Sequence, residues 1–97
     1  MKKLIIDLDD TISKTIDGDY INSLPNQSVI NKMFQYKQDG FEIVIYSSRN
    51  MRTYDGNIGM INVHTLPQII SWLKKYKVPF DQIIVYVSIY LVFVYLL

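Results

Sequence analysis

Three acidic residues follow the first apolar segment of the chain. Asp7, Asp9 and Asp10 come directly after the apolar run 4–6, and Thr11 follows them. If the backbone stays extended past Asp7, the carboxylates of Asp7 and Asp9 project to the same side and can meet at one ligand. Two such carboxylates repel each other, and a divalent cation relieves the repulsion. Magnesium favours one or two carboxylates with water and phosphate oxygens, so the sequence predicts a Mg²⁺ site at Asp7 and Asp9 and a small phosphorylated substrate.

A second polar group follows the next β-rich segment. Ser47, Ser48 and Arg49 come directly after residues 41–46, which are β-branched and aromatic. Ligands of open α/β sheets bind outside the carboxyl ends of parallel strands, so we expect Ser47 to face the same pocket as Asp7. The Ser47 hydroxyl can hold a phosphoryl oxygen, and the planar guanidinium of Arg49 can clamp phosphate.

The elements that must position these residues alternate between strand and helix. Apolar patterning predicts strands at 4–6, 41–46 and 83–87. A helix is predicted at 25–39, since Pro25 suits its first turn and Gly40 its end. A second helix is predicted after Thr65, which has the spacing of a capping box with Gln68. This order favours a parallel sheet with right-handed crossovers. The first strand reads as buried on both faces. We therefore predict an α/β fold: a three-layer, Rossmann-like sheet that stops after its third strand.

Two stretches between these elements lack a clear hydrophobic period. Residues 12–23 are polar and carry the turn pair Asp17-Gly18, which indicates a loop or small hairpin above the first strand. Residues 49–63 read as an irregular loop that leaves the carboxyl end of the second strand. Loops at that edge of a sheet commonly carry function.

Composition limits the classes of protein that fit. The 97 residues make one domain, 1–97, and the net charge of +1 gives no strong basic field, so we expect no nucleic acid partner. Without cysteine there is no disulfide, thiolate zinc site or cysteine nucleophile. The apolar run after Lys2 and Lys3 stops at Asp7, short of a signal-peptide core of roughly 7 to 15 residues, so we expect a cytoplasmic protein.

The end of the chain differs in composition from the rest. Residues 83–97 carry no charge. As a helix they would span about 22 Å, short of a hydrocarbon core of roughly 30 Å. Membrane contact through this tail is therefore the less favoured interpretation. One hypothesis is that the segment after Val85 is an out-of-frame or truncated ending, which makes residues 86–97 atypical of the domain.

The two polar motifs resemble those of the haloacid dehalogenase-like superfamily. Its first motif is Asp-x-Asp-x-Thr, here Asp7, Asp9 and Thr11, and its second is a Ser or Thr that ends the next core strand, here Ser47. The wider pattern, over about residues 2–85, is similar to the short phosphatases of that superfamily that are associated with bacterial capsule and surface-polysaccharide synthesis. The pattern includes residues 46–52, Thr65-Leu66-Pro67 and Trp72-Leu73.

The resemblance implies a mechanism for each matching residue. Asp7 would attack phosphorus to form an aspartyl-phosphate, and Asp9 would protonate the leaving oxygen and later activate water. Asp7 and the backbone carbonyl of Asp9 would ligate Mg²⁺. Thr11 would buttress the loop, and it joins Ser47, Ser48 and Arg49 in the set expected at the phosphate. The resemblance makes a sugar phosphate the candidate substrate. Only forty residues separate Asp7 from Ser47, too few for a large cap domain, so the pocket would be open or covered by another copy in a homo-oligomer.

The sequence also departs from the superfamily pattern. Members carry a third-motif Lys or Arg and fourth-motif acids, and neither follows Val85. Lys74, Lys75 and Lys77, like Asp81, precede the third strand and are expected at the opposite, amino edge of the sheet. An inactive remnant that serves as a binding protein is therefore the alternative to a phosphatase. A phospho-receiver domain ranks last, because it needs an acceptor Asp at the end of a later strand.

Overall fold

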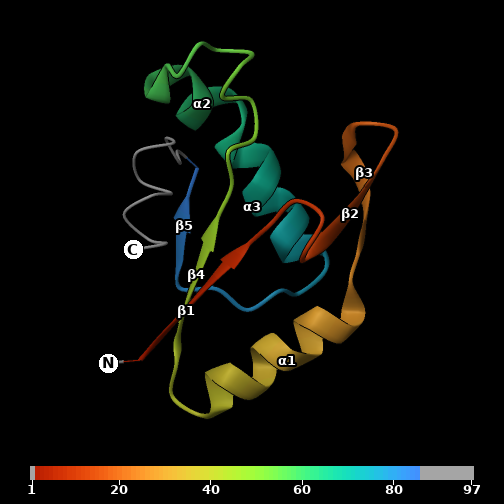
Figure 1. Ribbon diagram of the computed structural model, residues 1–97, viewed down its shortest axis with the longest axis vertical. Helices are drawn as coiled ribbons and strands as arrows, with labels where there is room; N and C mark the ends of the chain where they lie inside the picture. The colour runs from red at the N-terminus through yellow and green to blue at the C-terminus, as the bar shows by residue number, and fades with distance from the viewer. Residues whose placement is uncertain (1, 86–97) are drawn as a thin grey trace.

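The central element is a parallel sheet of three strands. The computed structural model describes residues 2–85, and within them the sheet has the order β1 (Lys3–Asp7), β4 (Glu42–Tyr46) and β5 (Gln82–Ile84) (Figure 1). Asp7 pairs with Tyr46, and Tyr46 pairs with Ile84. The ladder continues one step past each strand, since the Leu8 amide donates to the Tyr46 carbonyl and the Ser47 amide to that of Ile84. The carboxyl ends of the strands therefore lie together at one edge, as the sequence predicts.

An antiparallel hairpin leaves the carboxyl end of β1. Its strands are β2 (Ser13–Ile16) and β3 (Asp19–Pro25), joined by Asp17 and Gly18, both of which have positive φ. Two such residues match the twist of a two-residue hairpin turn. The small hairpin expected between residues 12 and 23 is thus present. Pro25 closes β3 instead of opening a helix, and Asn26 is the helix N-cap.

The first crossover helix, α1 (Gln27–Gln38), links the hairpin to β4. Ile30 and Met33, one turn apart, are its buried residues, whereas Phe34 is 43% exposed. Gly40, at φ 87°, reverses the chain after Asp39 so that β4 can begin. The helix, its start apart, lies where the hydrophobic period predicts it.

The second crossover contains two helices instead of one. Residues 49–63, predicted to be irregular, include α2 (Ile58–His64), whose first turn is capped by the Asn57 side chain accepting from the Met60 amide at 3.1 Å. The next helix is α3 (Leu66–Lys75). The predicted capping box at Thr65 is wrong: Thr65 has helical dihedral angles, because α2 ends against it, and its Oγ1 accepts from Asn50 Nδ2 at 2.8 Å.

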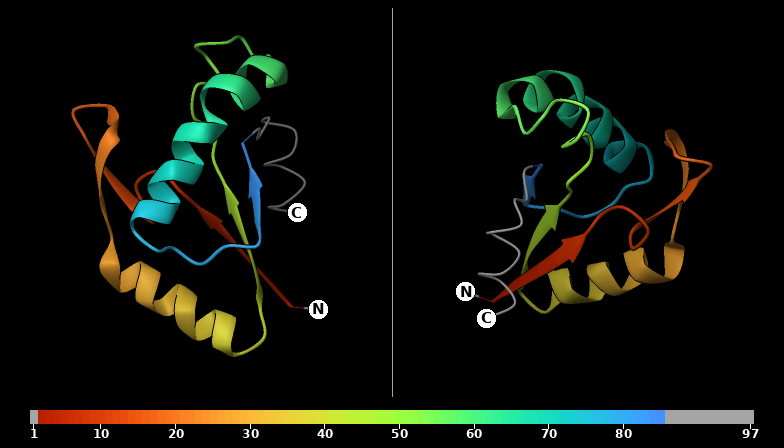
Figure 2. Two further views of the ribbon diagram at one scale, coloured as in Figure 1. Left: turned by 180° about the vertical axis from the view of Figure 1, so that it is seen from behind. Right: turned by 45° about the horizontal axis from the view of Figure 1, so that its top comes forward.

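The main core cluster lies on one face of the sheet, although Val44, which pairs with Ile5 on the other face, is also buried, at 3% exposed. Ile43 and Ile45 join residues of α1 and α3 in a single buried cluster, and Leu4 and Ile6 of β1 pack against it. Because β1, β4 and β5 add in one direction, right-handed crossovers put both helices on the same side (Figure 2). Ile5, which points the other way, is 44% exposed. Within residues 2–85, therefore, the predicted helices on both faces are reduced to one helical layer, and β1 is not buried on both faces.

Two predictions fall partly or wholly outside the described residues. β5 is shorter than the predicted strand at 83–87, of which residues 86 and 87 are not described, and the unusual tail at 86–97 lies beyond residue 85 altogether. Among the helices of residues 2–85, none has the length and apolar character needed to cross a membrane.

Candidate active site

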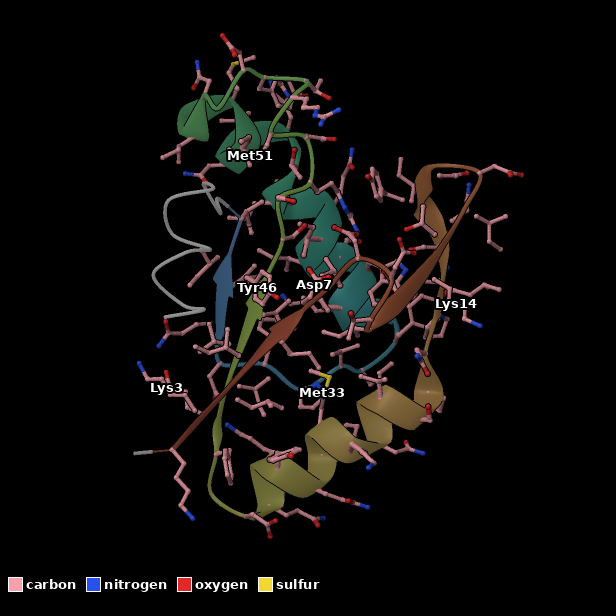
Figure 3. All side chains as sticks on the ribbon, in the orientation of Figure 1. Lys3, Asp7, Lys14, Met33, Tyr46 and Met51 are labelled. Carbon is pink, nitrogen blue, oxygen red and sulfur yellow. The ribbon has the colours of Figure 1, made fainter. Side chains whose placement is uncertain are left out.

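Asp7 stands at the carboxyl end of β1, beside Tyr46 at the end of β4 (Figure 3). The loop that follows is built on Leu8, whose side chain is buried and whose carbonyl accepts from the Ile12 and Ser13 amides at 3.0 Å. Asp10 takes a left-handed conformation, φ 62°, and its Oδ1 accepts from the Thr15 amide. The chain therefore turns sharply just after Asp7, which keeps Asp9 at the strand end.

Asp9 joins the first and second polar motifs. Its Oδ2 accepts from Ser47 Oγ at 2.7 Å, and its Oδ1 accepts from Arg49 Nη2 at 2.6 Å. Ser47 Oγ in turn accepts from the Arg49 amide at 3.0 Å. Ser47 is fully buried and the Arg49 side chain is 3% exposed, whereas the Asp9 side chain is 21% exposed. The predicted neighbourhood of residues forty positions apart is thus present, held by charge-assisted hydrogen bonds.

Arg49 extends this cluster toward the hairpin. Its guanidinium carbon lies 4.4 Å from the centre of the Tyr20 ring, a cation–π distance. Its Nη2 is bound to Asp9, but its Nε is buried and has no hydrogen-bond partner among residues 2–85. An unpaired buried donor on a cation is costly. Sequence reasoning missed Tyr20, because nothing local links β3 to the end of β4.

Burial raises the pKa of Asp7, and the neighbouring carboxylates of Asp9 and Asp10 raise it further, although the Leu8 amide acts in the opposite direction. The carboxylate of Asp7 is thus poorly compensated in the charged form. A divalent cation would supply the missing positive charge, and a carboxylate with a backbone carbonyl is a donor set that Mg²⁺ accepts. Asp7 and the carbonyl of Asp9 are the groups that would hold such an ion.

The donor set is a sparse one. Residues 2–85 contain no cluster of three or more Asp, Glu, His or Cys side chains arranged to hold a metal. Both carboxylate oxygens of Asp9 are already engaged by Ser47 and Arg49, so Asp9 can contribute its backbone carbonyl more readily than its side chain. Such a site suits Mg²⁺, which uses few protein ligands and keeps several waters.

Two other predicted site residues are less closely tied to Asp9. Thr11 lies in the same loop, where its carbonyl accepts from Asn26 Nδ2 at 3.2 Å. Ser48 is exposed, beside the buried Ser47 and Arg49. No side-chain hydrogen bond links Thr11 or Ser48 to Asp9 within residues 2–85, so their roles at a phosphate stay predictions.

Asp81 and Lys75 are two of the residues expected at the amino edge of the sheet. Asp81 lies at the amino end of β4 as expected, where its carboxylate accepts from the Ile43 amide at 2.8 Å and pairs with Lys37. These contacts lower the pKa of Asp81. Lys75, near the end of α3, lines a pocket that extends along this helix from Pro67 and also includes Arg49. Its expected place toward the amino edge of the sheet stays a prediction.

Comparison with known proteins gives matches among solved structures. No family model and no curated protein matches the chain. Among solved structures, a chain of the Pnkp1/Rnl/Hen1 complex is 22% identical, with a TM-score of 0.64 over 91% of this chain and 29% of that one. A chain of the Pnkp1/Rnl/Hen1 RNA repair complex is also 22% identical, with a TM-score of 0.61 over 91% of this chain and 26% of that one. At this identity the two matches show a shared fold.

A third solved structure has a much higher sequence identity to this chain. A crystal structure of an MCSG target protein from Vibrio cholerae is 56% identical to this chain, with a TM-score of 0.85 over 88% of this chain and 69% of that one. The parallel α/β unit therefore exists in an experimentally determined relative. The chain belongs to the same protein family as this Vibrio cholerae protein.

Proposed function

We propose that this protein is a magnesium-dependent phosphatase of the haloacid dehalogenase-like type, which hydrolyses a small phosphorylated metabolite through an aspartyl-phosphate. The observation that carries the proposal is the cluster of Asp9, Ser47 and Arg49 at the carboxyl edge of the sheet, next to the partly buried Asp7.

In this proposal Asp7 is the nucleophile. One of its carboxylate oxygens attacks phosphorus, the bond from phosphorus to the leaving oxygen breaks, and the leaving oxygen takes a proton from Asp9. Water then attacks the phosphoryl group and gives a proton back to Asp9, which frees Asp7 and phosphate. A bound Mg²⁺ would offset the negative charge of the phosphoryl group. Ser47 and Arg49 orient Asp9, which must open one of these two contacts for each proton transfer.

The substrate class rests on resemblance to phosphatases of capsule and surface-polysaccharide synthesis. A sugar phosphate is accordingly the first substrate to test. Nothing in the chemistry of Asp7 and Asp9 depends on the sugar itself, so a generic substrate such as p-nitrophenyl phosphate tests the reaction separately from the specificity.

The second candidate is a binding protein that holds phosphate without turnover. It is favoured by the engagement of both carboxylate oxygens of Asp9, since a residue fixed in this way has no free oxygen for the leaving group. The two candidates differ in one measurable property, the release of inorganic phosphate.

The test is phosphate release from p-nitrophenyl phosphate by purified protein, with Mg²⁺ and with EDTA. We expect Mg²⁺-dependent release that disappears in Asp7→Asn and falls about 10²- to 10⁴-fold in Asp9→Asn, the range for loss of a general acid. Asp17→Asn is the matched control, because Asp17 lies exposed at the hairpin turn. Full activity in Asp7→Asn would exclude the proposed nucleophile, and absence of release from folded wild-type protein would favour the binding protein.

A further inference from the structure

β1 is an edge strand of the described sheet. It pairs with β4 on one side, and no strand within residues 2–85 lies along its other side (Figure 1). An edge strand presents backbone N–H and C=O groups that can pair with another chain. The side chain of Ile5, in the middle of β1, is 44% exposed. We call this unpaired side of β1 the free edge.

The hydrogen bonds between β1 and β4 determine which residues point to the free edge. The Leu8 amide donates to the Tyr46 carbonyl at 3.0 Å, and the Lys2 carbonyl accepts from the Glu42 amide at 2.8 Å. Alternate residues of a strand direct their backbone groups to opposite sides, so the even-numbered residues of this segment bond to β4. The residues that direct their N–H and C=O groups to the free edge are therefore the odd-numbered ones, Lys3, Ile5 and Asp7.

The sequence of β1 is complementary to itself in an antiparallel arrangement. Lys3 and Asp7 stand at the two ends of the strand, with Ile5 at its centre (Figure 3). Two copies that pair about Ile5 place Lys3 of each copy opposite Asp7 of the other, and all three residues that point to the free edge are then hydrogen-bonded. A register shifted by two residues would set Lys3 or Asp7 opposite Ile5 instead.

The two residues that meet in this register carry opposite charges. Lys3, Ile5 and Asp7 alternate along the strand, so their side chains share one face of the sheet. Directly opposite residues of an antiparallel pair have Cβ atoms about 4.5 to 5.5 Å apart, within reach of an ion pair. Among the salt bridges of residues 2–85, none involves Lys3 or Asp7. A second copy of the same strand therefore matches both the backbone groups and the charges of the free edge.

We propose that two copies of this chain associate through antiparallel pairing of their β1 strands, which joins their three-stranded sheets into one. The interface is isologous, with a twofold axis at Ile5. Each copy contributes Lys3 to the candidate active site of the other, beside Asp7. The association does not depend on the proposed phosphatase function, because the backbone groups and the two charges carry it.

A charge swap between copies tests the proposal. Sedimentation velocity of the full chain over a concentration series gives the Kd of the dimer. Lys3→Glu opposes two carboxylates at each end of the pairing, and Asp7→Lys opposes two amines. We therefore expect each variant alone to dimerise about 10- to 100-fold more weakly than the wild type. An equal mixture of the two variants should recover the wild-type Kd, because every opposed pair in the mixed dimer has opposite charges.

Two further variants serve as controls. Lys74→Glu changes the net charge as Lys3→Glu does, at an exposed lysine of α3, and should leave the Kd unchanged. The double variant Lys3→Glu with Asp7→Lys keeps every opposed pair complementary, so it should dimerise as the wild type does. Circular dichroism verifies that each variant is folded, and the double variant tests the pairing where a single variant fails to fold.

Hydrogen exchange identifies what covers the free edge. The amides of Ile5 and Asp7 point to it, so they should be protected in the wild type and lose that protection on dilution. Protection that dilution leaves unchanged would mean that the same chain covers the edge, and it would overturn the proposal. A wild type that stays monomeric, a dimer that both charge variants preserve, or a mixture that does not associate would overturn it as well.

Discussion

Asp7 carries a charge that the fold leaves poorly compensated. Its pKa is raised from the ordinary value of 3.8 by burial and then by the carboxylates of Asp9 and Asp10. Ser47 and Arg49 both satisfy Asp9 instead. The two carboxylates, two residues apart, therefore differ in what surrounds them, and this difference makes Asp7 the one that needs a cation.

The first prediction concerns pH and stability. The pKa of Asp7 is higher in the folded than in the unfolded chain, so the folded state binds more protons at pH values between the two. The free energy of unfolding therefore falls as the pH rises from the unfolded-state pKa through the folded-state pKa. We expect Asp7→Asn to lose less stability than the wild type as the pH rises above about 4, the ordinary pKa of an aspartate. Thermal unfolding followed by circular dichroism measures the difference.

Asp19 provides the control with the opposite sign. Hydrogen bonds from Asn22 lower the pKa of Asp19, so its contribution to stability is present above the unfolded-state pKa and is lost as the pH falls. Asp19→Asn should therefore lower stability most at neutral pH. If Asp7→Asn showed the pH profile of Asp19→Asn, the account of Asp7 would be wrong.

The second prediction compares neighbouring hydroxyls. Ser47→Ala removes the donor to Asp9 Oδ2 and the acceptor of the Arg49 amide, so the orientation of Asp9 is lost together with a buried acceptor. We expect kcat for p-nitrophenyl phosphate to fall about 10- to 100-fold, part of the range for loss of acid–base catalysis. Ser48→Ala, at an exposed neighbour, should change kcat much less. Equal losses in the two variants would contradict the orienting role of Ser47.

At the scale of elements, one side-chain hydrogen bond within residues 2–85 joins the hairpin to α3. Trp72 is 7% exposed, and its Nε1 donates to the carbonyl of Ser23, itself 1% exposed. The same face of α3 also carries Gln68, Ser71 and Lys75, which line a pocket together with Arg49 and residues of β3. The packing of this helix therefore helps to position both the hairpin and the wall of that pocket.

The third prediction tests this attachment. Trp72→Phe keeps an aromatic ring but leaves the buried Ser23 carbonyl without its donor, at a cost of about 1 to 3 kcal/mol. We expect faster hydrogen exchange of the hairpin amides and a lower free energy of unfolding in urea. Tyr76→Phe, in the aromatic neighbour whose ring centre lies 4.8 Å from that of Trp72, is the control for loss of a polar atom. Unchanged exchange in Trp72→Phe would show that other contacts hold the hairpin.

At the scale of the whole molecule, the main cluster of the described core lies on one face of the sheet, and Val44 is buried on the other. The cluster built on Ile43 and Ile45 joins both crossover helices, whereas Ile5 on the other face is 44% exposed. Sheet order and the handedness of the crossovers cause this asymmetry, since successive strands add on the same side.

The fourth prediction measures that asymmetry. Ile45→Ala should destabilise the protein by about 2 to 5 kcal/mol, because it leaves a cavity in the packed face. Ile5→Ala, the same change on the neighbouring strand, should cost much less because Ile5 is already partly in contact with water. Urea unfolding of both variants gives the comparison. Equal costs would mean that the face of Ile5 is as closely packed as that of Ile45.

The sequence predicts the strand ends better than it predicts the second crossover. Period-two and apolar patterns locate β1 and β4, and a parallel arrangement then suffices to bring Asp7 and Ser47 to one edge. The sequence does not predict α2, because a short helix among turn residues has too few turns to show a hydrophobic period. Thr65 has the composition of a helix cap, but the preceding helix decides its conformation.

The sequence alone determines the parallel α/β order and the position of Asp7, Asp9, Ser47 and Arg49 at its carboxyl edge, because local periodicity and strand direction fix both. Only the tertiary structure decides which groups meet there. Arg49 pairs with Asp9 and lies over the Tyr20 ring, and Arg49 and Lys75 line the same pocket. The reason is physical. Strand order follows from backbone hydrogen bonds repeated along a short segment, whereas these contacts depend on how a hairpin and a helix, far apart in the chain, pack against each other.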